Sequence, residues 1–525
     1  MKSYKNHLTS IGFNNNYLLR KPIYRSSAIF PFLINKKMNT NIHFLGYWLI
    51  KRNIKEITLL ITIRDKLGKI YKRFSKAVIE VKSYTINLKK EIGENNKKDF
   101  TGSIELEVFS TQDMVFPYPA FVVSFDGEES SSVVHTCGRI YNDHDDFIAN
   151  NQFLVPETGF DISNNKDYLP FFSFVNGNTD LKNLKIVLEL INSSGLKKRK
   201  SLIFKKINSF ETVFVNFVDK NEKKFFNNEK GTVKIYHNFK SFFPRFLAGN
   251  FDKKKKNSSI THTYYDLSKK KDETQYWKNP NKKKYFDSAI AVPLIFRDRM
   301  YTELAIYPNF SKIDFNLNLQ IFDKNGNNLK NILDFLKIKE NFNYPRYVNL
   351  NELITKNNIK LDKNQNYFCR LYTSSRKKIL ARLKFGLNIG TDNKFRKSIA
   401  SNICFNAQVP VKDIYKKKGT FKWGLIKNNY NSQIFISNLG FLKKNFKKAN
   451  IILKFWNEFN NNFLEKKITI PDKGSYFFYL NKNKKIKNFL KKNPGWVTIQ
   501  SDNPFVNGWY LDISKNGSVG ADHLF

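Results

Sequence analysis

Short apolar runs that alternate with polar residues recur along the whole chain and predict β-strands. The alternation is clear over residues 104–108 (IELEV) and 316–321 (NLNLQI), where every second side chain is apolar. Successive side chains of a strand point to opposite faces, so each run buries one face and leaves the other in water. Patterns of helical period are few, and only residues 328–340 and 482–492 predict a short helix each. The chain is therefore expected to be mainly antiparallel β-structure.

One combination of strand, turn and strand occurs four times. The copies span residues 56–70, 184–204, 315–329 and 449–470. Glycine occupies the first three turns, at Gly68, Gly195 and Gly326, and an Asn-rich turn near Asn460 takes its place in the fourth copy. Glycine accepts the positive φ angle that tight hairpin turns need. Self-similarity at a period of this length indicates a duplicated folding unit.

A serine-rich motif closes each copy. SSVVHT at residues 131–136 returns as SSITHT at 258–263, so that Ser132 aligns with Ser259 and His135 with His262. The third and fourth copies are KSIASNICF at residues 397–405 and GSVGADHLF at 517–525. Because each motif follows the last predicted strands of its unit, it is expected to form the closing strand.

The repeats predict an all-β protein of four tandem antiparallel β-sandwiches, Ig-like or jelly-roll-like, with few short helices. Residues 1–20 form a polar leader whose composition permits disorder. The predicted repeats are residues 21–150, 151–287, 288–408 and 409–525. The sequence leaves open whether these units form a rod or a compact cluster.

Composition supports folded cores and points to a basic surface. Hydrophobic residues make up 41% of the 525 residues, and the formal net charge is +45. Lysine, asparagine, isoleucine and phenylalanine are enriched together, so an AT-rich genome accounts for the charge as well as an acidic partner would. Charge of this size predicts weak, non-specific attraction to polyanions. The lysine runs lack interleaved aromatic residues, which argues against a dedicated nucleic-acid protein.

Three cysteines cannot form a disulfide framework for four domains, and the sequence predicts no cofactor. The first residues lack the continuous apolar core of a secretory signal, and no apolar stretch is long enough to be a transmembrane segment. The default expectation is a soluble cytoplasmic protein, with export by a non-classical route left open.

The histidines are the strongest candidates for a binding site. His135 and His262 occupy equivalent places, and further candidate ligands follow each of them. The full candidate set is His135, Cys137, His144, Asp146, His262, Asp266, Tyr276 and Trp277. Imidazole, thiolate and carboxylate groups can bind zinc. Units strung end to end would hold the two equivalent histidines tens of ångströms apart, however, so a shared site requires the units to face one another. The favoured interpretation is therefore structural, with no metal ligands assigned: strand-end histidines that bond a neighbouring backbone group.

No catalytic motif is present. The chain has no G-x-S-x-G elbow, P-loop or H-E-x-x-H pattern. Ser132 lies three residues before His135, and residues three apart in a strand point to opposite faces, which argues against a nucleophile and base pair. Trp496 and Trp509 lie in strand patterns and are expected in the core, whereas Tyr276 and Trp277 lie in a predicted linker.

Two functional hypotheses follow. The first is a non-enzymatic tandem-repeat binding or scaffold protein whose partner is a glycan, a cell-envelope polymer or another protein, since repeated weak sites gain avidity. The alternative is a metal-dependent or glycan-processing enzyme with a site between repeats 1 and 2, around His135, Asp146 and His262.

Overall fold

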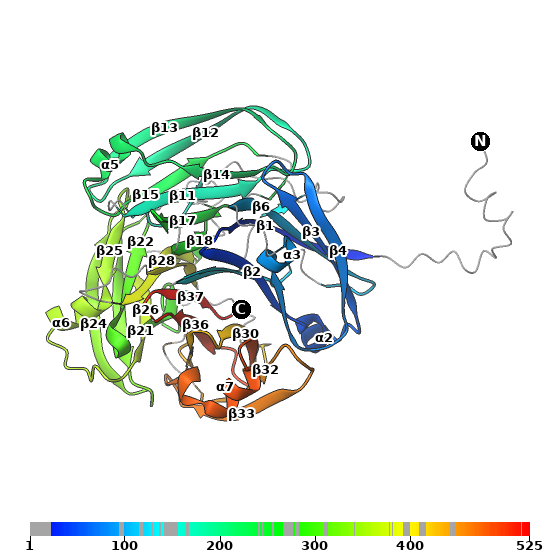
Figure 1. Cartoon of the computed structure of the whole chain (residues 1–525). Helices are drawn as coiled ribbons and strands as arrows, with labels where there is room; N and C mark the ends of the chain where they lie inside the picture. Colours follow the sequence, from blue (N-terminus) through cyan, green and yellow to red (C-terminus); the bar gives the residue numbers. More distant parts are fainter. Residues whose placement is uncertain are drawn as a thin grey trace, which may run out of the picture.

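The structure is a computed structural model, and it shows a cluster of β-sandwiches around a common centre (Figure 1). It describes residues 23–93, 99–114, 119–128, 130–135, 138–140, 156–163, 167–239, 242–243, 245–254, 257–265, 277–278, 283–308, 313–340, 342–376, 379–380, 382–391, 400–408, 416–440, 443, 447–515 and 517–525. Within these ranges, no helix is both long and apolar enough to cross a lipid bilayer.

The first sandwich packs two antiparallel sheets, ordered β1-β6-β3-β4 and β5-β2-β7-β8, face to face. Its strands are β1 (Tyr24–Ile34), β2 (Met38–Leu45), β3 (Ile57–Asp65), β4 (Ile70–Val78), β5 (Ser83–Asn87), β6 (Phe100–Ser110), β7 (Val122–Gly127) and β8 (Ser131–Val134). Alternate residues of β3, such as Leu59, Ile61 and Ile63, are buried between the sheets. The apolar residues that alternate with polar ones in the sequence are therefore the side chains that fill this core.

The fourth sandwich repeats the same strand order, with sheets β30-β35-β32-β33 and β34-β31-β36-β37. Its strands are β30 (Thr420–Lys427), β31 (Asn431–Ser437), β32 (Ala449–Trp456), β33 (Phe463–Ile470), β34 (Ser475–Tyr479), β35 (Pro494–Ser501), β36 (Asn507–Ile513) and β37 (Val519–His523). Trp496 and Trp509 are buried here, as the sequence predicted.

The second sandwich keeps this order and adds a short strand at one edge. Its sheets are β13-β12-β15-β10-β19 and β14-β11-β17-β18. The strands are β10 (Glu157–Thr158), β11 (Tyr168–Val175), β12 (Leu181–Ile191), β13 (Lys197–Ile207), β14 (Thr212–Asn216), β15 (Thr232–Tyr236), β17 (Leu247–Asp252), β18 (Ser258–His262) and β19 (Tyr264–Tyr265). Two-residue strands β9 (Arg139–Ile140) and β16 (Phe242–Phe243) pair beside it.

In the third sandwich the two layers are joined edge to edge into one sheet, ordered β24-β23-β26-β21-β29-β28-β22-β25. The single pair Ala289 and Gln408 makes the join. The strands are β21 (Ala289–Leu294), β22 (Met300–Ile306), β23 (Phe315–Phe322), β24 (Asn328–Ile338), β25 (Arg346–Asn349), β26 (Tyr367–Ser374), β28 (Arg382–Thr391) and β29 (Ser401–Gln408), with β20 (Trp277–Lys278) paired to β27 (Ile379–Leu380) beside them. One strand order thus recurs in all four groups, and the predicted all-β, antiparallel sandwich fold is confirmed.

Helices are short and lie in the connections. They are α2 (Tyr47–Arg52), α3 (Leu88–Glu91), α5 (Lys220–Phe226), α6 (Leu350–Lys356) and α7 (Lys484–Leu490), with 3-10 turns η3 (Arg297–Arg299) and η5 (Leu480–Lys482). The helix predicted at 482–492 is present as α7, but the one predicted at 328–340 is wrong, because those residues form β24. A register shift after Leu317 and a left-handed backbone at Asp334 interrupt the period of two there. The resulting apolar spacing imitates a helix.

The hairpin turns carry positive φ angles where the sequence places glycine. The φ angles are 89° at Gly68, 87° at Gly195 and 87° at Gly326. Each turn also approaches the next sandwich along the chain. The backbone N–H of Thr212 donates to the carbonyl of Lys66 at 2.9 Å, and that of Ser475 donates to Lys324 at 3.0 Å. The donors, Thr212 and Ser475, are each the first residue of the fifth strand of their sandwich.

The same contact closes the chain into a ring. The N–H of Ser83, at the start of β5, donates to the carbonyl of Asn457 in the Asn-rich turn region of the fourth sandwich at 2.8 Å. Between the second and third sandwiches, Gly195 packs so closely on Tyr344 that a Cβ atom there would lie 2.9 Å from the Tyr344 Cβ. Each sandwich therefore receives the hairpin of the one before it, and the fourth passes its own to the first.

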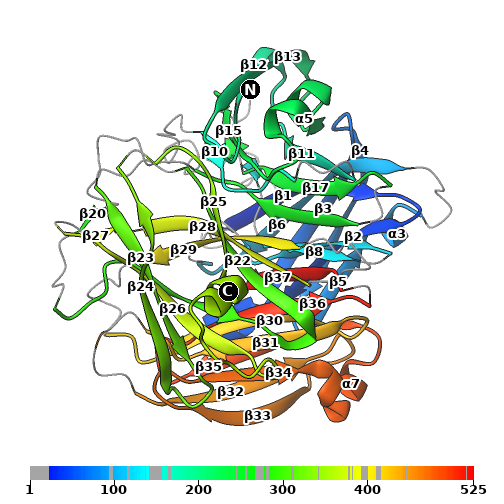
Figure 2. The same ribbon diagram turned by 90° about the vertical axis from the view of Figure 1, so that its left-hand side faces the viewer.

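The four closing strands meet at the centre of this ring. β8 packs against β18, β18 against β29, β29 against β37, and β37 against β8. Figure 1 shows the carboxyl end of the chain at this centre, and Figure 2 shows β8, β29 and β37 between the surrounding sandwiches. The serine motifs therefore lie together on one axis, and the four units form a compact cluster.

The hydrophobic cores extend across the borders of the sandwiches. Leu45, Val122 and Val133 of the first sandwich belong to the core of the fourth. The core of the first in turn includes Phe171 and Leu247 of the second. The boundaries near residues 150, 288 and 408 stay predictions, and the leader and residues 141–155 lie outside the described ranges.

Candidate functional site

The serines of the motif join neighbouring closing strands. Ser132 Oγ donates to the Ser258 carbonyl and accepts from the backbone N–H of Ile260 at 3.3 Å. On the other side of the centre, Ser401 Oγ accepts from the N–H of Ala521 at 3.1 Å. A serine is small and bonds to backbone groups, so strands without a shared ladder can approach here. Ser132 bonds to the strand of the second sandwich and thus plays a structural part.

Three histidines from three different motifs lie together at the ends of the central closing strands. The ring centroid of His135 lies 4.8 Å from that of His262 and 4.6 Å from that of His523. Asp522 also belongs to this group, since its Oδ2 accepts from Nδ1 of His135 at 2.8 Å. The units are thus not strung end to end, and the condition for bringing His135 and His262 together, that the units face one another, is met. The ring closure brings equivalent strand ends to the same axis.

The other two histidines of this cluster bond neighbouring backbone groups. His262 Nδ1 donates to the Thr263 carbonyl at 2.8 Å, and His523 Nδ1 donates to the Leu524 carbonyl at 3.1 Å. Burial lowers the pKa of His523 to about 4, with a further contribution from His135. Burial, followed by the charges of His135 and Arg245, lowers the pKa of His262 well below its ordinary value. Both rings are therefore neutral at pH 7.

Most other residues of the predicted set lie outside the described ranges. Cys137, His144, Asp146, Asp266 and Tyr276 are among them, and for Trp277 only the backbone is described, in the short strand β20. Their part in a site stays a prediction. Asp522 was missed by the sequence reasoning. It precedes His523, which the sequence alignment displaces by two positions, whereas in the structure His262 and His523 are each the last residue of their closing strand.

A second polar cluster lies between the first and fourth sandwiches. Lys427 Nζ donates to Asp126 Oδ1 at 2.6 Å, and Ser131 Oγ donates to the same oxygen at 2.7 Å. Asp126 Oδ2 accepts from Ser124 Oγ and from Asn41 Nδ2, each at 2.7 Å. Burial alone would raise the pKa of Asp126, but the Lys427 ammonium and the other donors outweigh it and lower that pKa to about 2. This cluster holds a buried ion pair across the ring closure.

A third polar cluster lies between the second and third sandwiches. Asp161 accepts from Tyr307 at 2.9 Å and from Asn388 Nδ2 at 2.6 Å. Asn388 also donates to Glu303 at 2.9 Å, and Glu303 pairs with Lys230. Burial raises the pKa of Asp161, although Lys230 opposes this. Its donors satisfy both carboxylate oxygens, which is the arrangement of a structural network.

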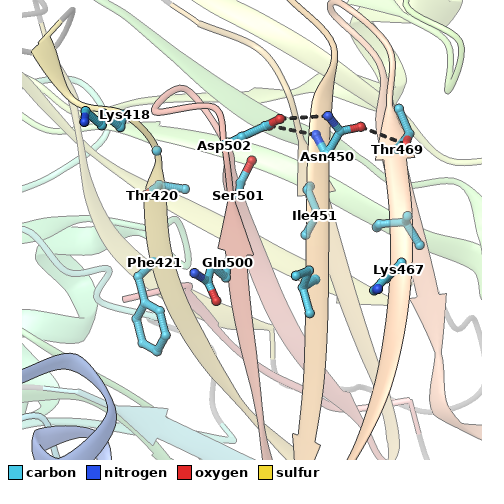
Figure 3. A pocket seen from close by; sticks show the side chains of 13 residues that line it. Lys418, Thr420, Phe421, Asn450, Ile451, Lys467, Thr469, Gln500, Ser501 and Asp502 are labelled. Carbon is cyan, nitrogen blue, oxygen red and sulfur yellow. Dashed lines mark hydrogen bonds between the residues drawn. The ribbon is translucent and has the colours of Figure 1, made fainter. Parts of the chain in front are cut away.

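A groove of 910 Å³ lies across the outer face of the sheet β30-β35-β32-β33 (Figure 3). Cross-strand pairing places Phe421 beside Gln500, Gln500 beside Ile452, and Ile452 beside Lys467. These four side chains form one row across the four strands. Successive side chains of a strand point to opposite faces, so these four side chains point away from the core and the residues between them point into it.

A second row in the groove is polar and held in place by hydrogen bonds. Asn450 Nδ2 donates to Asp502 Oδ2 at 2.7 Å, and Asn450 Oδ1 accepts from Thr469 Oγ1 at 3.1 Å. Figure 3 shows this chain of side chains above the row that contains Phe421 and Gln500. The groove therefore combines an aromatic ring, an aliphatic side chain and several donors and acceptors. Alternation in the sequence predicted the outward positions, but it gave no sign of the hollow.

Comparison with known proteins adds little to this description. The architecture defines an all-β protein of four antiparallel sandwiches. No protein-family model matches the chain, and no curated protein matches its sequence. Among solved structures, a beta-glucuronidase from glycoside hydrolase family 2 is similar at 10% identity, over 46% of this chain and 24% of that one. The TM-score of 0.11 means that this similarity carries no argument about function.

Proposed function

We propose that this chain is a non-enzymatic binding or scaffold protein and that the groove on its fourth sandwich holds a glycan or cell-envelope polysaccharide. The observation that carries the proposal is that two apolar side chains of the first row, Phe421 and Ile452, lie beside the polar row around Asn450. A sugar ring has an apolar face and a rim of hydroxyl groups, so it needs both kinds of contact at once. Binding sites for such ligands are mostly apolar with a few well-placed polar groups.

The polar row supports the proposal because its geometry is already fixed. Asn450 is held by Asp502 and Thr469, so it loses little rotamer freedom when a ligand binds. Lys418 and Lys467 line the same groove and favour a glycan that carries carboxylate groups. The repeated sandwiches would present further outer sheets to the same polymer, and several weak contacts on one chain add avidity.

The test is retention of the full chain in gels that contain neutral or uronate-bearing polysaccharides. Phe421→Ala should weaken retention about tenfold, because aromatic anchors dominate such contacts. Gln500→Ala should weaken it less, because that variant loses only the hydrogen bonds of the amide. Ile79→Ala removes an exposed apolar side chain from the connection that follows β4, outside the outer sheets, and serves as the matched control. Unchanged retention of both groove variants would refute the groove. Retention by every polyanion, abolished by moderate salt, would show charge attraction alone and refute the glycan assignment.

A further inference from the structure

The strand ends at the centre of the ring bring together chemistry that the proposed glycan groove does not use. His135 follows β8, His262 ends β18, and Asp522 and His523 end β37. One candidate ligand atom from each of His135, Asp522 and His523 lies within 4.8 Å of the others. These residues come from three sandwiches, so the cluster exists only because the ring is closed.

The hydrogen bonds define which nitrogen of each ring is available. A backbone carbonyl can only accept, so Nδ1 of His262 and Nδ1 of His523 carry the proton. Nδ1 of His135 faces the Asp522 carboxylate in the same way. Nε2 of His262 and Nε2 of His523 therefore carry a lone pair, and Nε2 of His135 is the ring nitrogen that does not bond Asp522. Metal-binding histidines show this pattern, in which Nδ1 donates to a carbonyl or carboxylate and Nε2 faces the metal.

His262 supplies an independent sign that a ligand belongs here. Its side chain is 7% exposed, and its Nε2 has no hydrogen-bond partner among the described residues. A buried polar atom without a partner is costly and calls for an explanation. A metal bond to this lone pair would remove that cost.

We propose that His135, His262, His523 and Asp522 form a site for a divalent transition metal, with Zn²⁺ as the best match. Zinc prefers three or four nitrogen and oxygen ligands, and bonds of about 2.0–2.1 Å in a tetrahedral site place the imidazole centroids about 5 Å apart. The observed centroid distances of 4.8 and 4.6 Å meet this requirement. Asp522 supplies the negative charge, as a direct ligand or through Nδ1 of His135.

Electrostatics around the cluster is consistent with this assignment. Arg245 lies near His262 and opposes a cation, whereas Asp522 favours one. His523 is 34% exposed, which leaves the cluster accessible from solvent.

The experiment uses the full chain, stripped with a chelator and titrated with Zn²⁺ or Co²⁺ alone. We expect one equivalent of metal per chain after gel filtration and the strong visible absorption of four-coordinate Co²⁺. His135→Ala and His523→Ala should each lower the affinity at least about tenfold. His237→Ala removes another imidazole, which packs on Phe239 and Phe246 and is not one of the four proposed ligands, and should leave binding unchanged.

Two results would overturn the site. One is a folded chain that binds no stoichiometric metal, and the other is undiminished binding by the double variant His135→Ala/His523→Ala. Asp522→Asn keeps the shape of the side chain and provides a further test if an alanine variant does not fold. It should weaken metal binding, whereas unchanged affinity would count against the site. Because the groove lies on the outer sheet of the fourth sandwich, glycan retention and metal binding can fail independently.

Discussion

Loss of the Lys427 ammonium should destabilise the protein more than loss of any exposed lysine. The Lys427 side chain is 4% exposed and pairs with Asp126 between the first and fourth sandwiches. In Lys427→Met the apolar volume is largely kept, but the half-buried Asp126 carboxylate, 20% exposed, is left without a countercharge. Breaking a buried pair in this way costs about 3–5 kcal/mol. Asp126 keeps three neutral donors, Asn41, Ser124 and Ser131, so the lower end of this range, about 3 kcal/mol, is expected.

The measurement is urea unfolding at pH 7, followed by intrinsic fluorescence, for the wild type and four variants. Lys72→Met is the matched control, because Lys72 also pairs with a carboxylate at 2.6 Å but is 43% exposed. An exposed pair contributes about 0–1 kcal/mol. The variants Asp126→Asn and Lys427→Met/Asp126→Asn complete a double-mutant cycle, in which the double variant should recover most of the loss.

The pKa of Asp126 gives the same prediction a pH dependence. This pKa is about 2 in the folded chain and below its ordinary value, so ionised Asp126 stabilises the fold above about pH 4. The contribution is lost as the pH falls towards 2. In Lys427→Met the pair no longer lowers the pKa, so the variant should be least different from the wild type in acid. Equal losses for Lys427→Met and Lys72→Met at pH 7 would refute the reasoning.

Two further predictions concern a buried carboxyl group and the hairpin contacts. Burial raises the pKa of Asp512 to about 6, although Lys427 opposes this, so the ionised group costs stability as the pH rises from about 4 to 6. Asp512→Asn should gain about 2 kcal/mol relative to the wild type between pH 4.5 and 7.5, by denaturant unfolding at both values; a constant difference would contradict it. Gly326→Ala should lower the free energy of unfolding more than Gly93→Ala. Both glycines have positive φ, but of the two only Gly326 has a neighbour that a Cβ atom would meet, the Asp472 carbonyl at 1.9 Å. Gly93→Ala should show the backbone cost alone, about 1–2 kcal/mol in thermal unfolding, and equal losses would show that the hairpin contact contributes nothing.

The local features of the fold could be predicted from the sequence because local rules determine them. Alternation in residues 104–108 corresponds to β6, and the three turn glycines adopt the positive φ that their spacing indicated. The error at residues 328–340 has the same origin. There a register shift in the pairing with β23 breaks the period of two, and sequence pattern alone does not reveal a bulge.

The candidate sites could be predicted only in part, because they depend on contacts between distant segments. The sequence singled out His135 and His262, but nothing local showed that their strand ends share an axis with Asp522 and His523. The Lys427 and Asp126 pair joins residues 301 positions apart and has no motif. Sequence reading identifies the strands, whereas these pairs depend on how separate sheets dock.

Ring closure explains why equivalent positions carry different chemistry. Four copies of one strand meet at the centre, and small residues are needed wherever two copies touch; a Cβ atom on Gly520 would lie 2.0 Å from the Ser131 carbonyl. The ends of the strands are free of that requirement. There the first, second and fourth copies carry histidine, whereas the third copy has Asn402 at the start of β29, where it bonds Tyr307 and Asn388. The four repeated units thus form the ring, and the different residues at their strand ends form the asymmetric cluster of His135, His262, His523 and Asp522. A chain of four identical units would lack this cluster.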